Sequence, residues 1–416
     1  MTNLSDIVNF LPRMKSGDDL ITALEVLPEY NPKICNTDVP LRLMALSDLY
    51  KVYIPSQMSL EIYSKLYLAL LRSMQKKGTK LAVQQQNQNY RAIMQQEYSG
   101  IMGGTDSFTI IGTSGIGKSS AISKAINLIT ENRVFEADNP YTHVVPCIIV
   151  QCPFDSSVKG LLLEVLRKVD EVLDSKYYQN ALKARATTDM LIGSVSQVAL
   201  NHIGMLVVDE IQNVANSKNG KSLIGALTQL INNSGISICM VGTPESSRFF
   251  ESAMQLARRS VGLQYTTMSY DKYFQAFCKV IFRYQYVKQR AEITDGIIAW
   301  LYEHSAGITS VVVALIHDAQ EIAILNGKEI LNLESLHAAY QQRLSLLHRH
   351  IQPYSSQGKK SSKIKKKAPV PTAMVTENET SADHISIADL VAKAKHESID
   401  IVQLLKSNIS VVEVNV

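Results

Sequence analysis

The sequence predicts an α/β fold in which helices cover both faces of a parallel β-sheet, and three observations lead to this prediction. Between residues 107 and 270, short apolar runs of strand length alternate with stretches of amphipathic helical periodicity. A glycine-rich segment that ends in Lys118 and Ser119 stands between the first of these runs and the helix that follows it. From residue 270 the strand-like runs stop, and helical periodicity continues to about residue 350.

The composition of the 416 residues is that of a globular protein with two or three domains. Hydrophobic residues make up 46%, charged residues 19%, and the mean hydropathy is -0.00, which excludes a disordered or collagen-like chain. We see no apolar run near the roughly 18 to 20 residues of a membrane helix, and no apolar signal core in residues 1–19, so we expect a cytoplasmic protein. The five cysteines are odd in number and form no Cys-x-x-Cys pair, which disfavours both a disulfide framework and a structural zinc site.

Each element can be justified in chain order. Residues 1–100 are predicted to be mostly helical, because apolar residues recur at helical spacing in 60–71, and a Gln-rich segment follows at 84–96. The apolar runs predict five parallel strands, and the intervals between the first four hold helices. The predicted strands are 108–111, 144–150, 203–208, 236–241 and 263–268.

The remainder of the chain is predicted to form a small helical domain and a tail. Thr294 and Asn332 suit helix N-caps, and Gly307 and Gly327 suit helix ends. Six lysines between residues 359 and 367, without an acidic residue, predict a flexible basic tail, followed by a short segment with helical apolar spacing. The predicted helices are 273–286, 295–304, 311–325 and 333–348, and the predicted regions are 1–100, 101–269, 270–352 and 353–416.

The glycine-rich segment is the sharpest chemical signal. Residues 112–119, with the sequence GTSGIGKS, fit the phosphate-loop (P-loop) pattern Gly-x-x-x-x-Gly-Lys-Ser/Thr at every defined position, between a strand and a helix. Such glycines let backbone N–H groups point at phosphate oxygens, while Lys118 would contact the β- and γ-phosphates of ATP and Ser119 would bind Mg²⁺. The predicted ATP-binding residues are Gly112, Thr113, Ser114, Gly115, Ile116, Gly117, Lys118, Ser119 and Ser120.

Two carboxylates end the third apolar run, in Asp209 and Glu210. Asp209 would join Ser119 in the magnesium shell, and Glu210 would orient and deprotonate the attacking water, because phosphoryl transfer depends on positioning and electrostatics. The next run ends at Thr243, whose hydroxyl is a candidate for contact with this water or the γ-phosphate. A Gly-Thr-Pro turn is also ordinary loop chemistry, and that alternative stays open for Thr243.

These features resemble the AAA+ ATPases over about residues 100–350, with Walker A at 112–119, Walker B at 206–210 and sensor 1 at Thr243. The resemblance implies that an arginine completes the site of a neighbouring subunit, and Arg258 and Arg259 occupy the matching positions. An arginine suits a γ-phosphate because its planar fork carries a permanent charge. The alternative is a solvated helix end with cations near its C-terminus. Residues 307–311 contain no sensor-2 arginine, which implies slow hydrolysis or nucleotide sensing by the residues in trans.

Within AAA+, the sequence resembles the TnsC/TniB family of transposon ATPases, through the segments 153–160, 209–213, 241–245 and 255–259. This resemblance implies a bacterial, ATP- and Mg²⁺-dependent DNA-binding regulator of transposition, a form of DNA recombination. Its members form rings or helical filaments on target duplex DNA. The N-terminal region would bind target selectors, and a short helix in the tail would dock on the transposase. A disordered solubilising tail is the alternative for residues 353–416.

The same resemblance places DNA contacts between Walker A and Walker B. A lysine or hydroxyl from each subunit that follows the phosphate backbone would bind DNA with little sequence preference and strong salt dependence. A solvated helix face is the alternative. Lys159 and Thr188 are the first choices by position, followed by Arg185, and the interval also offers Ser157, Lys183 and Thr187.

Two other functions remain open from the sequence. The missing sensor-2 arginine suits a nucleotide-gated scaffold that binds ATP but hardly hydrolyses it. An AAA+ loader or regulator of another DNA-processing pathway, or of secretion, would carry the same Walker motifs, although the lack of an apolar membrane run disfavours the secretion version.

Overall fold

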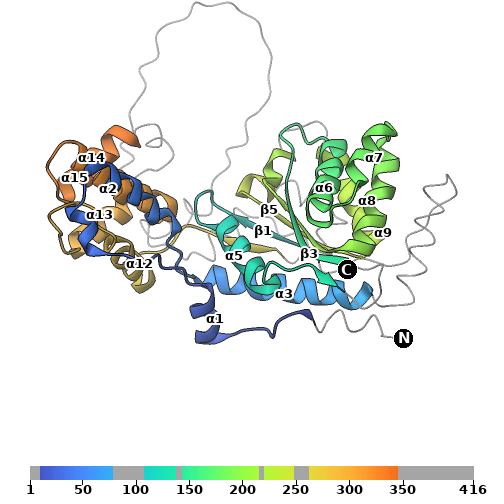
Figure 1. Cartoon of the computed structure of the whole chain (residues 1–416), viewed down its shortest axis with the longest axis horizontal. Coiled ribbons are helices and arrows are strands. Elements are labelled where there is room, and N and C mark those ends of the chain that lie inside the picture. The colour runs from blue at the N-terminus through green and yellow to red at the C-terminus, as the bar shows by residue number, and fades with distance from the viewer. Residues whose placement is uncertain (1–9, 78–106, 137–142, 215–219, 248–261, 345–416) are drawn as a thin grey trace, which may run out of the picture. The chain divides into compact units, whose positions relative to one another are not determined.

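The computed structural model describes residues 10–77, 107–136, 143–214, 220–247 and 262–344, which all belong to one compact unit of residues 1–359 (Figure 1). The predicted tail and the Gln-rich segment lie outside the described residues. The N-terminal part is helical. Its elements are α1 (Gly17–Leu24), the 3-10 helices η2 (Pro32–Asn36) and η3 (Leu46–Lys51), α2 (Val39–Ala45) and α3 (Gln57–Lys77).

The fold is α/β, and the described residues form a six-stranded sheet in the order β2-β3-β4-β5-β1-β6. All neighbouring strands are parallel except β2 and β3. The five predicted parallel strands are therefore confirmed, and the sequence missed β2 because a two-residue strand shows no periodicity. The strands are β1 (Phe108–Gly112), β2 (Phe135–Glu136), β3 (His143–Gln151), β4 (Ile203–Asp209), β5 (Ser237–Gly242) and β6 (Leu263–Tyr265).

The last strand is shorter than the predicted range of 263–268. Only Leu263–Tyr265 pairs with β1, through Ile110–Gly112. Beyond this point the chain turns to the helical domain, where the backbone N–H of Met268 donates to the carbonyl of Gly307 at 3.0 Å. The apolar run continues past β6 because Met268 packs against the core of the helical domain instead of the sheet.

Helices cover both faces of the sheet, as predicted (Figure 1). The pleat sends Leu206 and Val208 of β4 to the face covered by α6, α8 and α9, and Met205 and Val207 to the face covered by α3 and α5. A strand buried on both sides reads as a continuous apolar run, which is why β4 was recognisable in the sequence. The covering helices are α5 (Lys118–Thr130), α6 (Val158–Leu173), α7 (Tyr177–Lys183), α8 (Thr188–His202) and α9 (Gly220–Ser234).

The helical domain after the sheet, here called the lid, contains α12 (Lys272–Phe282), α13 (Asp295–Ser305), α14 (Thr309–Leu325) and α15 (Leu333–Arg343). The predicted N-caps are confirmed: Thr294 accepts a hydrogen bond from the N–H of Ile297, and Asn332 forms a capping box with Ser335. In the described residues, no single helix is long and apolar enough to span a membrane, although α13 and α14, bent by 119° at their junction, meet the requirement as a pair.

The N-terminal helices are built into both cores instead of standing apart. Leu46 and Leu49 of η3 lie in the lid core, and the buried face of α3 lies in the sheet core. Arg42 of α2 is fully buried and binds both carboxylate oxygens of Glu329 in the lid, at 2.6 and 2.7 Å. The N-terminal region, which the resemblance assigns to partner binding, therefore also forms part of the lid core and an ion pair with the lid.

Gly307 and Gly327 end lid helices with left-handed backbones, at φ of +74° and +75°. A Cβ on Gly307 would lie 2.2 Å from the carbonyl oxygen of Met268, whereas a Cβ on Gly327 would meet nothing within 4 Å. We expect Gly327→Ala to cost about 1 to 2 kcal/mol of stability from backbone strain alone. Gly307→Ala should cost a further ~1–3 kcal/mol because backbone must move. Chemical denaturation of both variants measures this difference, and equal losses would contradict it.

Candidate nucleotide-binding site

A cavity of about 410 Å³ lies at the carboxyl edge of the sheet, where the loop after β1 meets the ends of β4 and β5, the lid and the N-terminal segment 49–59. Carboxyl ends of parallel strands gather at one edge, so the predicted motifs converge there although they are far apart in sequence. The predicted residues that line the cavity are Ser114, Gly115, Ile116, Gly117, Lys118, Ser119, Ser120, Asp209, Glu210 and Thr243.

The loop after β1 has the backbone of a phosphate cradle. Gly115 and Gly117 have φ of +81° and +92°, and Lys118 begins α5, whose first three residues line the cavity. The Lys118 ammonium donates to the carbonyls of Gly112 at 2.7 Å and Thr113 at 2.9 Å. Burial lowers the pKa of Lys118, while the nearby carboxylates, Asp209 first, oppose this shift. The loop thus holds its own cation in place beside the cavity.

The two predicted magnesium ligands are in direct contact. The Ser119 hydroxyl donates to Oδ2 of Asp209 at 2.8 Å, and Oδ1 of Asp209 accepts the backbone N–H of Glu210 at 2.8 Å. A hydroxyl and a carboxylate side by side are hard oxygen donors of the kind that Mg²⁺ takes together with phosphate oxygens. These residues therefore fit the implied ion.

Glu210 follows Asp209 in a left-handed conformation, at φ of +57°. Its carbonyl accepts the N–H of Asn213 at 3.1 Å, which starts the 3-10 turn η4 (Ile211–Val214). Its carboxylate accepts a hydrogen bond from the side-chain amide of Gln212. This turn carries the carboxylate beyond the end of β4 and into the cavity lining. Sequence reasoning missed Gln212, which also lines the cavity.

Thr243 begins the turn after β5. Its hydroxyl donates to the carboxylate of Glu245, and its backbone N–H donates to Oε1 of Gln212 at 3.3 Å. The bond from Thr243 is the main cause of the lowered pKa of Glu245. The side chain predicted as sensor 1 thus lies in the cavity wall, and its contact with water or phosphate stays a prediction.

The lid contacts the phosphate loop through two hydroxyl-bearing residues at the start of α14. The Thr309 hydroxyl and the Ser310 backbone N–H donate to the carbonyl of Gly115 at 3.0 and 3.1 Å. A Cβ at Gly115 would lie 2.4 Å from the Ser310 hydroxyl. The start of α14, where an AAA+ lid would offer sensor 2, therefore touches the loop by polar contacts without a cation.

The N-terminal segment 49–59 forms one wall of the cavity, which the sequence did not predict. It is attached to the lid because the carbonyl of Ile54 accepts a hydrogen bond from the Tyr273 hydroxyl at 3.0 Å, and its Tyr53 backbone pairs with Val26 within the N-terminal part. Together with lid residues these side chains make an apolar end to the cavity, which suits the base of a nucleotide. The sequence signal that could have indicated this wall is the apolar segment with two tyrosines just before Pro55. The lining residues of the segment are Leu49, Tyr50, Val52, Tyr53, Ile54, Ser56, Met58 and Ser59.

The other predicted site residues, where the structure describes them, do not line the cavity. Arg258 and Arg259 lie outside the described residues. Lys159 and Thr188 lie in the first turns of α6 and α8, and both turns are at the carboxyl edge because α6 follows β3 and α8 runs back to the start of β4. Two further hydroxyls act as helix caps: Ser157 accepts the N–H of Gly160 and Thr187 that of Met190. Arg185 and Lys183 are exposed near the end of α7.

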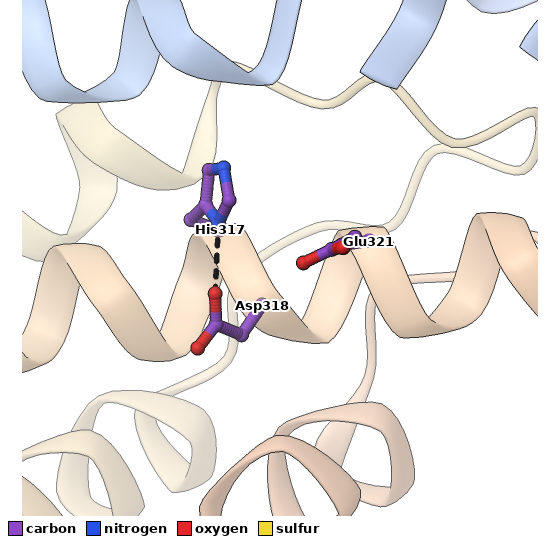
Figure 2. Close-up of side chains that lie close together, drawn as sticks. All are labelled: His317, Asp318 and Glu321. Carbon is purple, nitrogen blue, oxygen red and sulfur yellow. Dashed lines mark hydrogen bonds and ion pairs between the residues drawn. The ribbon is translucent and has the colours of Figure 1, made fainter. Parts of the chain in front are cut away.

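A second group of potential metal ligands lies on α14, outside the lining of the nucleotide cavity. Figure 2 shows His317 facing Asp318, with Glu321 one turn further along, and their ligand atoms lie within 4.8 Å of one another. His317 Nδ1 is 2.8 Å from Asp318, and Glu321 pairs with Arg343 at 3.5 Å. These two interactions account for the geometry of the group without an ion.

The chain is similar to one protein family and to several solved structures. Residues 84–267 match the family described as Bacterial TniB protein. Curated proteins contain no match to the sequence. Similar solved structures include the Aeropyrum pernix ORC1 protein in complex with DNA, at 13% identity and a TM-score of 0.43 over 67% of this chain and 69% of that one. Drosophila ORC bound to DNA has 11% identity and a TM-score of 0.43 over 95% and 82%. A Walker-type ATPase of Pyrococcus abyssi has 11% identity and a TM-score of 0.32 over 64% and 75%.

The matched stretch contains β1, the phosphate loop, β3, β4, β5 and β6, and therefore all the parallel strands of the described residues. The α/β fold, the Walker motifs and the helical lid are those of an AAA+ P-loop ATPase, as the sequence predicted. Over residues 84–267 the sequence is therefore similar to the TniB family.

Proposed function

We propose that this protein is an ATP-dependent, DNA-binding regulator of DNA transposition. It oligomerises as a ring or filament on target duplex DNA and links a target selector to the transposase. ATP closes the interface between subunits, and ATP hydrolysis drives disassembly. The observation that carries the proposal is the contact between Ser119 and Asp209 at the mouth of a phosphate loop, within a segment similar to the TniB family.

The residues of the cavity have separate roles in this proposal. Ser119 and Asp209 would hold a Mg²⁺ ion, which would supply positive charge to stabilise the phosphates of ATP. Lys118 binds the phosphates, Glu210 takes the proton of the attacking water, and Thr243 orients that water. An arginine of the neighbouring subunit, Arg258 or Arg259, reaches the γ-phosphate and makes assembly depend on ATP.

The DNA contacts are proposed at the carboxyl edge of the sheet. Lys159 is exposed in the first turn of α6, and Thr188 stands in the first turn of α8. Helix N-termini attract phosphate, so a lysine and a hydroxyl at two such ends suit contact with a DNA backbone. Arg185 precedes α8 and is exposed, which adds a cation to the same end.

The proposal is tested by negative-stain imaging of the full chain with duplex DNA, with and without a non-hydrolysable ATP analogue. We expect rings or filaments that need both ligands, and none for Lys118→Ala. Particles that do not respond to DNA would overturn the target-DNA role and leave an AAA+ ATPase with another macromolecular client.

Lys159→Ala is expected to weaken DNA binding on all sequences alike. Because one phosphate contact is lost, the slope of log affinity against log salt should decrease by about 1. Fluorescence anisotropy with duplex DNA and the ATP analogue measures this slope. Lys168→Ala is the matched control, since Lys168 lies further along the same helix and pairs with Glu171. An unchanged slope for Lys159→Ala would remove this residue from the DNA interface.

A nucleotide-gated scaffold with little hydrolysis, including a loader of another DNA-processing pathway, is the second candidate. It is favoured by the lid contact, which uses Thr309 and Ser310 where a sensor-2 arginine would be expected. ATP turnover near zero in the presence of DNA, with assembly intact, would select this function over the first.

A further inference from the structure

We propose that Gln212 is a positioning residue for ATP hydrolysis, which holds the carboxylate of Glu210 and joins it to the turn at Thr243. The inference rests on the proposed function, because it assigns Glu210 the role of base. It adds a residue of η4 that neither Walker B nor sensor 1 includes.

The hydrogen bonds of Gln212 determine which way its amide points. The backbone N–H of Thr243 can only donate, so the atom of Gln212 that lies 3.3 Å from it must be the oxygen. The NH₂ group then faces the other way, and it donates to Oε2 of Glu210. One planar amide therefore connects the end of β4 with the end of β5 across the cavity wall.

Glu210 needs such a partner because its own backbone leaves the strand. Its φ of +57° carries it out of the β4 ladder, and its carboxylate accepts a side-chain hydrogen bond from Gln212. A carboxylate on a flexible stem loses rotamer freedom when it is held in one place, and a neutral amide donor holds it without competing for the proton of water. Gln212 thus fixes the place of the base before substrate binds.

The chain also leaves room for this amide. A Cβ on Gly242 would lie 3.1 Å from Oε1 of Gln212, 2.7 Å from Ile211 and 2.8 Å from the Ser246 hydroxyl. Gly242 therefore lets the Gln212 side chain pass between the two strand ends, and Gly242→Ala should displace it.

The test is steady-state ATP turnover with DNA, together with ATP affinity, for Gln212→Met and Gln212→Glu. Met keeps the length and removes both hydrogen bonds, whereas Glu keeps the acceptor for Thr243 and removes the donor to Glu210. We expect both variants to lower kcat by about 10- to 100-fold, the cost of a misplaced catalytic group, with ATP affinity unchanged. If Gln212 only braced Thr243, Gln212→Glu would keep the wild-type kcat, and the inference would be wrong.

A double-mutant cycle with Glu210→Gln shows whether Gln212 acts through Glu210. Once the base is removed, Gln212→Met should lower the residual turnover no further. An equal fold-loss in both backgrounds would mean a structural role and overturn the inference while leaving the proposed function standing. Absence of turnover in the wild type would overturn the proposed hydrolysis and this inference together.

Discussion

Replacing Glu210 by glutamine is expected to lower ATP turnover by about 10²–10⁴-fold, the usual contribution of a general base. Glutamine has nearly the same shape and can still hydrogen-bond to water, but it cannot accept the proton. ATP binding should survive because Lys118, Ser119 and Asp209 remain. We therefore expect Glu210→Gln assemblies on DNA to persist after ATP is added, whereas those of the wild type disassemble.

Phosphate release and time-resolved imaging measure the two parts of this prediction. The exposed Glu136, on the two-residue strand β2, provides a charge-matched control as Glu136→Gln. Equal turnover by Glu210→Gln and the wild type would exclude Glu210 as the base. A variant that neither binds ATP nor assembles would instead indicate that this side chain is needed to form the site.

The second large effect is expected at Lys77, the last residue of α3. Its side chain is buried against the end of α8, where the Nζ donates to the carbonyls of Ala199 at 2.7 Å and Leu200 at 2.6 Å. Burial lowers the pKa of Lys77 to about 7. A free lysine has a pKa of about 10.4, so between these two values the unfolded chain holds a proton that the folded chain has released.

The sign of the pH dependence follows from this difference. Where the unfolded state binds more protons, stability rises with pH. Lys77 should therefore make the free energy of unfolding increase from about pH 7 to pH 10, with a slope approaching about 1.4 kcal/mol per pH unit. Below pH 7 both states hold the proton and the contribution is constant. The neutral amine still has N–H groups for both carbonyls, so the contacts persist as the charge is lost.

Denaturant unfolding of the wild type and Lys77→Met across pH 6 to 10 isolates this group. We expect the free energy of unfolding of the wild type, relative to that of Lys77→Met, to rise by several kcal/mol across this range, at about the slope given above. Lys51→Met is the control for the loss of a lysine, because the Lys51 side chain is 64% exposed. A pH-independent difference for Lys77→Met would mean that the buried amine keeps its proton.

The parallel strands and the chemistry at their ends were readable from the sequence for physical reasons. A strand buried on both faces must be apolar throughout, so β1, β3, β4 and β5 appear as runs, and the residue that ends each run sits at the edge where ligands bind. The phosphate loop needs glycines for its backbone conformation and one lysine for its charge. Few residue types can occupy these positions, so the pattern is recognisable in the sequence. Lys118, Ser119 and Asp209 were thus predicted from the sequence as phosphate and magnesium contacts.

Other features became visible only in three dimensions because they depend on contacts between distant segments. The wall formed by Val52 and Tyr53 lies more than 50 residues before the phosphate loop, and only packing against the lid brings it to the cavity. Gln212 looks like any polar residue of a turn until the end of β5 is placed beside it. The buried ion pair of Arg42 and Glu329 likewise joins α2 to the connection between α14 and α15, two segments that are far apart in the sequence.

The sequence by itself determined the α/β class, the order of the elements and the chemistry of the nucleotide loop, because periodicity and motif spacing are local properties of the chain. Tertiary structure alone decided that residues 10–77 belong to both cores, that Ser157 and Thr187 cap helices, and that Gln212 links Glu210 to Thr243. Burial, capping and side-chain bridges depend on which surfaces meet. That information lies in the packing of the whole chain, since a contact between distant residues leaves no periodic trace in the sequence.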